Sequence, residues 1–101
     1  MRIIAGEKRS RKLVAPEGME TRPTADRAKE ALFSILQFDI EGRRVLDLFA
    51  GTGQLGIEAL SRGAASAVLV DRRKDAVGLI RENLRITGLQ EIGRASCRER
   101  V

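Results

Sequence analysis

Val45-Leu46-Asp47-Leu48-Phe49-Ala50-Gly51-Thr52-Gly53-Gln54-Leu55-Gly56 joins a short apolar run to a glycine-rich turn through one acidic residue. The apolar residues predict a buried strand near residues 44–49, and residues from about 54 to 62 predict a helix. Gly51 and Gly53 let the backbone turn sharply and approach a ligand, and Gly56 permits close packing of helix on strand. This order predicts a cofactor pocket at the carboxyl end of a parallel strand.

The flanking segments predict an α/β fold built on a parallel βαβ unit. Residues 66–71 predict a second strand, and residues from about 73 to 87 predict a helix that Gly88 ends. A strand–helix–strand order favours a right-handed crossover and a parallel sheet. A further helix is predicted from about 25 to 38, with Thr24 as its N-cap. Its apolar residues recur at helical spacing and are Ala28, Ala31, Leu32, Ile35 and Leu36.

The two ends of the chain differ from this central unit. Residues 2–5 and 11–15 are apolar-rich runs separated by a basic stretch, which predicts a β-hairpin within residues 1–20. Residues 91–101 have no strand pattern, so we expect a non-native, vector-derived or read-through tail that does not continue the fold. A native basic tail is the alternative.

The composition limits the chemistry open to the chain. Its 101 residues suffice for one small domain, and the absence of histidine excludes histidine acid–base catalysis. The single Cys97 excludes an intramolecular disulfide and a cysteine metal cluster. No histidine activates Ser61 or any other serine, so the serines are predicted to be surface or turn residues. Because the chain also lacks a signal peptide or membrane span, we expect a cytoplasmic protein without a metal.

Most of the net charge of +5 lies near the N-terminus. Residues 1–12 hold five basic residues against a single Glu7. Such a cluster binds the phosphates of nucleic acid by releasing counterions, and a solvated basic arm is the alternative. The basic residues of the predicted hairpin are Lys8, Arg9, Arg11 and Lys12.

Two carboxylates beside the glycine loop bear on the identity of the ligand. The loop matches G-x-G-x-x-G, and Asp71 follows Gly51 by 20 residues, a spacing that also fits a dinucleotide. Asp47 would repel a pyrophosphate, whereas it could hold the loop through backbone N–H groups and offset the ammonium of S-adenosylmethionine. Asp71 could accept hydrogen bonds from both ribose hydroxyls of either ligand. The alternatives without a ligand are a loop cap at Asp47 and a helix N-cap at Asp71.

Four blocks of sequence, in this order, resemble one family of enzymes. They are Met1-Arg2-Ile3-Ile4-Ala5-Gly6 with Arg11-Lys12-Leu13, Thr21-Arg22-Pro23-Thr24 with Lys29-Glu30-Ala31-Leu32-Phe33, Val45 to Gly56, and Glu58 to Ala64. Over residues 1 to about 89 the chain is similar to the bacterial S-adenosylmethionine-dependent methyltransferases that modify the exocyclic N2 of a guanine in 16S ribosomal RNA. The resemblance implies a truncated, Rossmann-like class I methyltransferase fold. Residues 1–20 would be its basic hairpin extension and residues 21–90 the N-terminal half of the methyltransferase domain.

The resemblance also implies where the cofactor and the RNA would bind. The residues that match the cofactor segment are Asp47, Phe49, Ala50, Gly51, Thr52 and Gly53, with Asp71 on the ribose and Arg72 near the adenine. Arg22 and Thr24 would lie against the methionine end of the cofactor, and a capped helix start with Arg22 in solvent is the alternative. The hairpin bearing Lys8, Arg9, Arg11 and Lys12 would meet phosphates of 16S ribosomal RNA or of the assembling small subunit.

The chain departs from the family in one respect that concerns catalysis. Family members carry an Asn/Asp-Pro-Pro-Tyr/Phe motif that holds the target amine, and this chain has only Pro16 and Pro23. We therefore expect a fragment that is inactive by itself and whose open sheet edge favours self-association. Two alternatives are an NAD-dependent oxidoreductase fragment, supported by the glycine spacing, and a non-catalytic RNA-binding module, supported by the basic arm.

Overall fold

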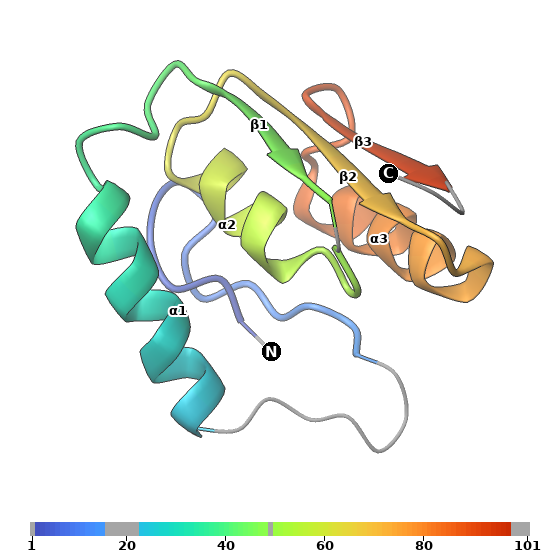
Figure 1. The fold of residues 1–101 in the computed structure, drawn as a ribbon, viewed down its shortest axis with the longest axis horizontal. Helices are drawn as coiled ribbons and strands as arrows, with labels where there is room; N and C mark the ends of the chain where they lie inside the picture. Colours follow the sequence, from blue (N-terminus) through green and yellow to red (C-terminus); the bar gives the residue numbers. More distant parts are fainter. Residues whose placement is uncertain (1, 16–22, 49, 98–101) are drawn as a thin grey trace.

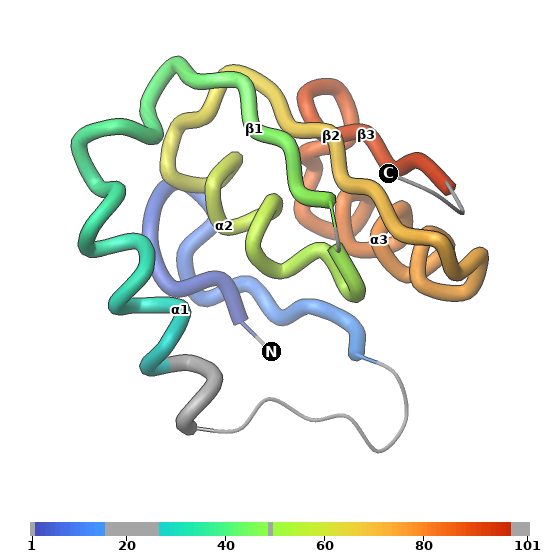
Figure 2. Tube along the Cα trace, in the orientation of Figure 1, coloured from blue at the N-terminus to red at the C-terminus, as the bar shows by residue number. Residues whose placement is uncertain are grey.

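Helices and strands alternate along the chain, as the sequence predicts. The computed structural model describes residues 2–15, 23–48 and 50–97, with the backbone alone at residues 23–26 (Figure 2). The elements are α1 (Pro23–Leu36), β1 (Arg44–Asp47), α2 (Gln54–Ser61), β2 (Ser66–Asp71), α3 (Lys74–Thr87) and β3 (Gly93–Cys97). The predicted α/β class is confirmed.

The three strands form a parallel sheet in the order β1-β2-β3. Val45 of β1 pairs with Ala67 of β2, and Asp47 pairs with Leu69. Helices α2 and α3 cover one face of this sheet (Figure 1). The carboxyl ends of the strands therefore meet at one edge, where ligands bind in open α/β folds.

The core lies between the sheet and these two helices. Ile57 of α2, Leu69 of β2 and Ile80 of α3 are fully buried, and burying each such side chain contributes about 1.5–3 kcal/mol. Gly56 permits this contact, because a Cβ there would lie 2.7 Å from the Leu69 Cδ2. The close helix-to-strand packing expected at Gly56 is thus observed.

The other face of the sheet bears exposed apolar side chains. Leu46 is 62% exposed and Val68 is 37% exposed, while the helices that pack on the sheet, α2 and α3, lie together on its opposite face in Figure 1. A hollow of about 680 Å³ on this face is lined by Leu46, Val68, Arg94 and other residues, none of them from the glycine loop. The self-association predicted from the open sheet edge stays a prediction.

Helix α1 begins earlier than the sequence predicts, so Thr24 is not its N-cap. The helix starts at Pro23, and Thr24 is its second residue. Proline suits the first position of a helix, because its fixed φ is already helical and the N–H that it lacks would have no partner within the helix.

The apolar face of α1 is largely exposed, although Leu36 packs against the core. Leu32 is 41% exposed and Ile35 is 77% exposed, whereas Lys29 and Phe33 are buried. The reason is tertiary: Lys29 forms a buried ion pair with Glu58 of α2, with 3.0 Å between its Nζ and the Oε1. Lys29 and Phe33, about one turn apart, therefore lie on the buried face of α1.

The N-terminal segment, residues 2–15, is less regular than the predicted hairpin. Its antiparallel pairing is one bridge between Arg2 and Lys12, together with hydrogen bonds between Ile3 and Arg11 and from Ser10 to Ile3. The regular ladder does not form because other backbone groups of this segment bond to side chains of α2, as described below.

The expectation that the chain after residue 91 does not continue the fold is wrong for residues 93–97. They form β3, which pairs parallel with β2 from Ala67 opposite Gly93 to Asp71 opposite Cys97. Strand pairing uses backbone groups that every residue except proline carries, so it can form without an apolar pattern. Gly93 also fits under Leu84, whose Cδ2 would lie 2.4 Å from a Cβ at that position.

Candidate cofactor site and N-terminal segment

The glycine loop lies at the carboxyl edge of the sheet, between β1 and α2 (Figure 1). Gly51 and Gly53 have φ of 58° and 83°, in the left-handed region where glycine is favoured. Gly53 is the N-cap of α2. The Ala50 N–H donates to the Val70 carbonyl at 2.9 Å, which ties the loop to β2. The predicted strand–loop–helix motif is confirmed.

Asp71, at the end of β2, holds the loop from the neighbouring strand. Its Oδ2 accepts the Gly51 N–H at 2.9 Å and its Oδ1 accepts the Arg73 N–H at 2.9 Å. The Arg73 N–H most strongly lowers the pKa of Asp71; partial burial opposes this, and the Gly51 N–H and the Arg73 charge lower it further. The N-cap of α3 is Arg73, so Asp71 is not a helix N-cap.

The ionised Asp71 keeps the capacity to bind hydroxyl groups. A carboxylate has about four lone-pair sites, and two backbone N–H groups occupy one on each oxygen. Among the described residues no atom lies within 4 Å of a Cβ placed at Gly51, so this part of the structure leaves open space beside the loop. The ribose role of Asp71 stays a prediction, and these features fit an adenosine-containing cofactor.

The structure says less about the other predicted cofactor residues. Asp47 is half-buried at the end of β1, and Arg72 is exposed just after β2. Arg22, Phe49 and the side chain of Thr24 lie outside the described residues. The roles expected for all five stay predictions.

Asn83 of α3 contacts the loop, and sequence reasoning missed it. Its side chain is fully buried, and its Nδ2 donates to the carbonyls of Thr52 and Val14, each at 3.0 Å. Its Oδ1 accepts the Val14 N–H at 2.6 Å. The one signal available was a polar residue between the inward-facing Ile80 and Leu84.

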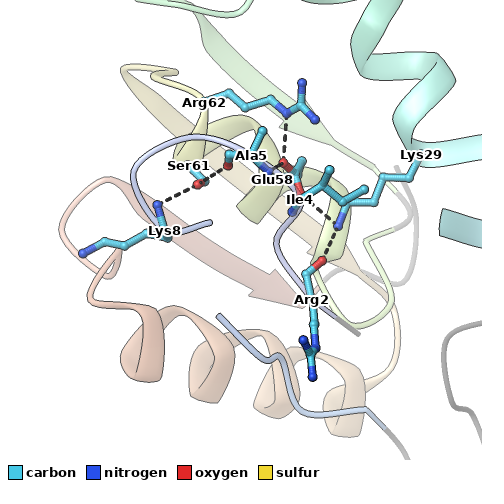
Figure 3. Close-up of polar contacts among 8 residues, drawn as sticks. All are labelled: Arg2, Ile4, Ala5, Lys8, Lys29, Glu58, Ser61 and Arg62. Carbon is cyan, nitrogen blue, oxygen red and sulfur yellow. Dashed lines mark hydrogen bonds and ion pairs between the residues drawn. The ribbon is translucent and has the colours of Figure 1, made fainter. Parts of the chain in front are cut away.

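Glu58 of α2 anchors the N-terminal segment (Figure 3). Its Oε1 accepts the Ile4 N–H at 2.7 Å, and its Oε2 accepts the Ala5 N–H at 3.0 Å. It also pairs with Lys29 of α1 at 3.0 Å and with Arg62 at 2.9 Å. One buried carboxylate therefore joins α1, α2 and the N-terminal segment.

The pKa of Glu58 is set by opposing effects. Burial raises it, whereas hydrogen bonds from Ile4, Arg62 and Ala5 and the charge of Lys29 lower it. The lowering effects prevail, so the pKa lies below its ordinary value and the carboxylate is ionised near neutral pH.

Ser61 provides the second attachment of this segment. Its Oγ accepts the Lys8 N–H at 3.0 Å and donates to the Ala5 carbonyl at 2.7 Å (Figure 3). It is buried, so its predicted place at the surface is wrong. A Cβ at Gly6 would lie 1.9 Å from the Ser61 carbonyl oxygen, which explains the glycine there.

The basic residues of the segment divide into two groups. Arg9, Arg11 and Lys12 are exposed. Lys8 is half-buried, and its ammonium lies beside Gly88, the C-cap of α3, where a positive charge offsets the helix dipole. Three of the four predicted RNA-binding residues are therefore free of such an internal role.

Residues 2–15, 23–48 and 50–97 contain neither a metal-binding cluster nor a membrane-spanning helix. No group of three His, Cys, Asp or Glu residues there could hold a metal ion. No helix of that part is long and apolar enough to cross a bilayer.

The parallel sheet, its covering helices and the glycine loop held by a strand-end aspartate define a Rossmann-like fold of the methyltransferase class. The model of the family described as Conserved hypothetical protein 95 matches residues 1–100, and the chain belongs to this family.

Named relatives agree with this assignment. The chain is 48% identical over 85 residues to the "Putative rRNA methyltransferase YlbH" of Bacillus subtilis, covering 84% of this chain and 46% of that protein. It is 51% identical over 71 residues to the "Ribosomal RNA small subunit methyltransferase D" of Escherichia coli, covering 70% and 36%. The solved structure "Putative methyltransferase yhhF from Escherichia coli" has a TM-score of 0.87 at 41% identity, covering 97% of this chain and 52% of that one. The chain thus spans about half the length of these proteins or less.

Proposed function

We propose that this chain is the N-terminal half of a methyltransferase that moves a methyl group from S-adenosylmethionine to the exocyclic N2 of a guanine in small-subunit ribosomal RNA. The observation that carries the proposal is the hydrogen bond from the Gly51 N–H to Asp71 at the carboxyl edge of a parallel sheet. Similarity to proteins named as ribosomal RNA methyltransferases supports the substrate class.

The cofactor would supply an electrophilic methyl group on its sulfonium. Asp47 would offset the ammonium charge, and Asp71 would accept hydrogen bonds from the ribose hydroxyls. Contacts are also proposed for Ala50, Gly51, Thr52, Gly53, Arg72, Arg22, Thr24 and Phe49. Because Asp47 ends β1 beside the glycine loop, a pyrophosphate there would meet its negative charge, which disfavours the dinucleotide alternative. Asp71 does not discriminate, since it suits the ribose of either ligand.

Titration of the chain with S-adenosylhomocysteine, followed by amide NMR, tests the cofactor. We expect the Gly51 and Gly53 amide signals to shift with S-adenosylhomocysteine and not with NAD. The dissociation constant should be weaker than micromolar, because the chain spans about half the length of its relatives. Asp71→Asn should weaken this binding at least about tenfold, the effect of roughly one lost charge-assisted hydrogen bond.

Glu82→Gln is the matched control. Glu82 is an acid of α3 whose described ion pair is with Arg85, away from the contact between Gly51 and Asp71. Shifts produced by NAD alone would overturn the methyltransferase assignment. Equal weakening by the two substitutions would refute the role of Asp71.

The RNA would contact the exposed basic residues of the N-terminal segment, Arg9, Arg11 and Lys12. Their place on backbone anchored to α2 by Glu58 and Ser61 would present a fixed positive surface to phosphates. Phosphate contacts position a substrate without reading its sequence, so the choice of guanine would depend on the remainder of the parent protein.

We further propose that residues 91–101 are not native to the protein. In β3 only Gly93 is buried, and the contribution of that strand is mainly backbone pairing. Sequencing the parent gene beyond codon 90 tests this. A different strand followed downstream by Asn-Pro-Pro-Tyr or a close variant would support both the foreign tail and the methyl-transfer chemistry, whereas Glu91 to Val101 in the genome would refute the foreign origin.

A further inference from the structure

Asn83 joins three parts of the chain that lie far apart in sequence. Its single amide group bonds to the backbone of Val14 and of Thr52, which are 69 and 31 residues away. The amide uses both of its N–H groups and its oxygen in these contacts. The N-terminal segment and the glycine loop are therefore held by the same side chain of α3.

The loop needs such external support. Thr52 lies between two glycines of positive φ, and glycine allows more backbone conformations than any other residue. Asp71 fixes the Gly51 N–H on one side, and Asn83 fixes the Thr52 carbonyl on the other. The two contacts together orient the backbone that would face a cofactor.

The backbone of the N-terminal segment also needs external support at Val14. The Val14 side chain is 42% exposed, so its apolar burial does little to hold the backbone there. Asn83 instead accepts a hydrogen bond from the Val14 N–H and donates one to the Val14 carbonyl, much as a paired strand would. Arg11 and Lys12, both exposed, precede this anchor by only two or three residues.

We propose that Asn83 is a positioning residue that couples the basic N-terminal segment to the cofactor loop. It sets the orientation of Thr52, and it transmits the docking of residues 11–15 to the loop. The inference rests on the proposed function. Since coupling of two binding events is reciprocal, a polyanion bound at Arg11 and Lys12 and a cofactor bound at the loop would each raise the affinity for the other.

Amide NMR of the unaltered chain during titration with S-adenosylhomocysteine provides the first test. We expect the Asn83 side-chain amide and the Val14 N–H to shift together with Gly51 and Gly53. Shifts confined to the glycine loop would overturn the coupling and leave the proposed cofactor intact. Shifts nowhere in the loop would instead count against the proposed function.

Asn83→Ala provides the second test, with Thr87→Val as its control. Thr87 is a buried residue one turn further along α3, and its hydroxyl donates to the backbone carbonyls of Asn83 and Leu84 and leaves the Asn83 side chain untouched. We expect Asn83→Ala to weaken S-adenosylhomocysteine binding about tenfold, the effect of roughly one lost hydrogen bond. Thr87→Val should leave the affinity within about twofold. Similar weakening in both variants would refute the positioning role, and if Asn83→Ala does not fold, the NMR titration decides.

Discussion

Replacing the buried Glu58 by glutamine should lower the free energy of unfolding more than replacing any exposed charged residue. The carboxylate accepts backbone N–H groups from Ile4 and Ala5 and pairs with Lys29 and Arg62. A glutamine amide keeps the shape but presents N–H groups to two of these donors. It also leaves the ammonium of Lys29, which is only 3% exposed, without its negative partner.

The size of the effect follows from the burial of the pair. Removing one partner of a buried ion pair costs about 3–5 kcal/mol, because the other charge stays uncompensated. The glutamine oxygen retains part of the hydrogen bonding, so we expect a loss of about 3 kcal/mol. A chain of this size has about 5–15 kcal/mol of stability in total. The urea midpoint should therefore fall by roughly 1–3 M for a typical dependence on denaturant.

Urea unfolding of three variants measures this loss against controls. Glu30→Gln changes a neighbouring but exposed acid of α1 and should alter the unfolding free energy by less than about 0.5 kcal/mol. The double variant Lys29→Met with Glu58→Gln removes both charges and should be more stable than Glu58→Gln alone. A loss below about 1 kcal/mol for Glu58→Gln, or a double variant less stable than the single one, would refute the reasoning.

The pH dependence of the same experiment has a defined sign. The pKa of Glu58 is held below its ordinary value, so the folded protein binds this proton less tightly than the unfolded chain. Its stabilisation is complete above the ordinary glutamate pKa of about 4.3 and is lost as the pH falls through the lower folded-state pKa. The difference in unfolding free energy between the parent chain and Glu58→Gln should therefore shrink below about pH 4.

Two further predictions concern helix packing and RNA binding. Gly56→Ala should lower the thermal midpoint at a cost of about 1–3 kcal/mol, because its Cβ would lie 2.7 Å from the Leu69 Cδ2. Gly78→Ala, in open space on α3, should instead be neutral or stabilise by up to about 1 kcal/mol; equal effects would contradict the packing argument. Arg11→Ala with Lys12→Ala should reduce the slope of log affinity for a 16S RNA fragment against log salt, in filter binding, by at most about 2. An unchanged slope would remove these two residues from the RNA interface.

The residues of the glycine motif show which structural features can be predicted from the sequence alone. The order of apolar run, Asp47 and two glycines predicts a strand, a left-handed turn and a helix, because each depends on local backbone preference and hydrophobic spacing. Asp71 was singled out by its distance from the loop along the chain. Its bond to Gly51 could not be predicted, because it depends on how the two parallel strands lie in register.

Polar residues inside the protein mark where the sequence falls short. Periodicity assigns Leu32 and Ile35 to the apolar face of α1 and takes no account of Lys29, which is buried against Glu58. Nothing local distinguishes a buried lysine from an exposed one, because its partner comes from another helix. Asn83 was overlooked for the same reason, since its partners are backbone groups 31 and 69 residues away.

The amino-acid sequence by itself determined the α/β alternation, the glycine loop and the family, because these depend on local preferences and on motif residues close together in the chain. The tertiary structure decided which polar side chains are buried and what they hold together. Glu58 and Asn83 are stable inside the protein only when distant donors and acceptors satisfy them, and that condition is met only after the N-terminal segment has docked on α2 and α3. The cofactor loop at residues 50–53 is therefore encoded locally, and its orientation is fixed by contacts with distant parts of the chain.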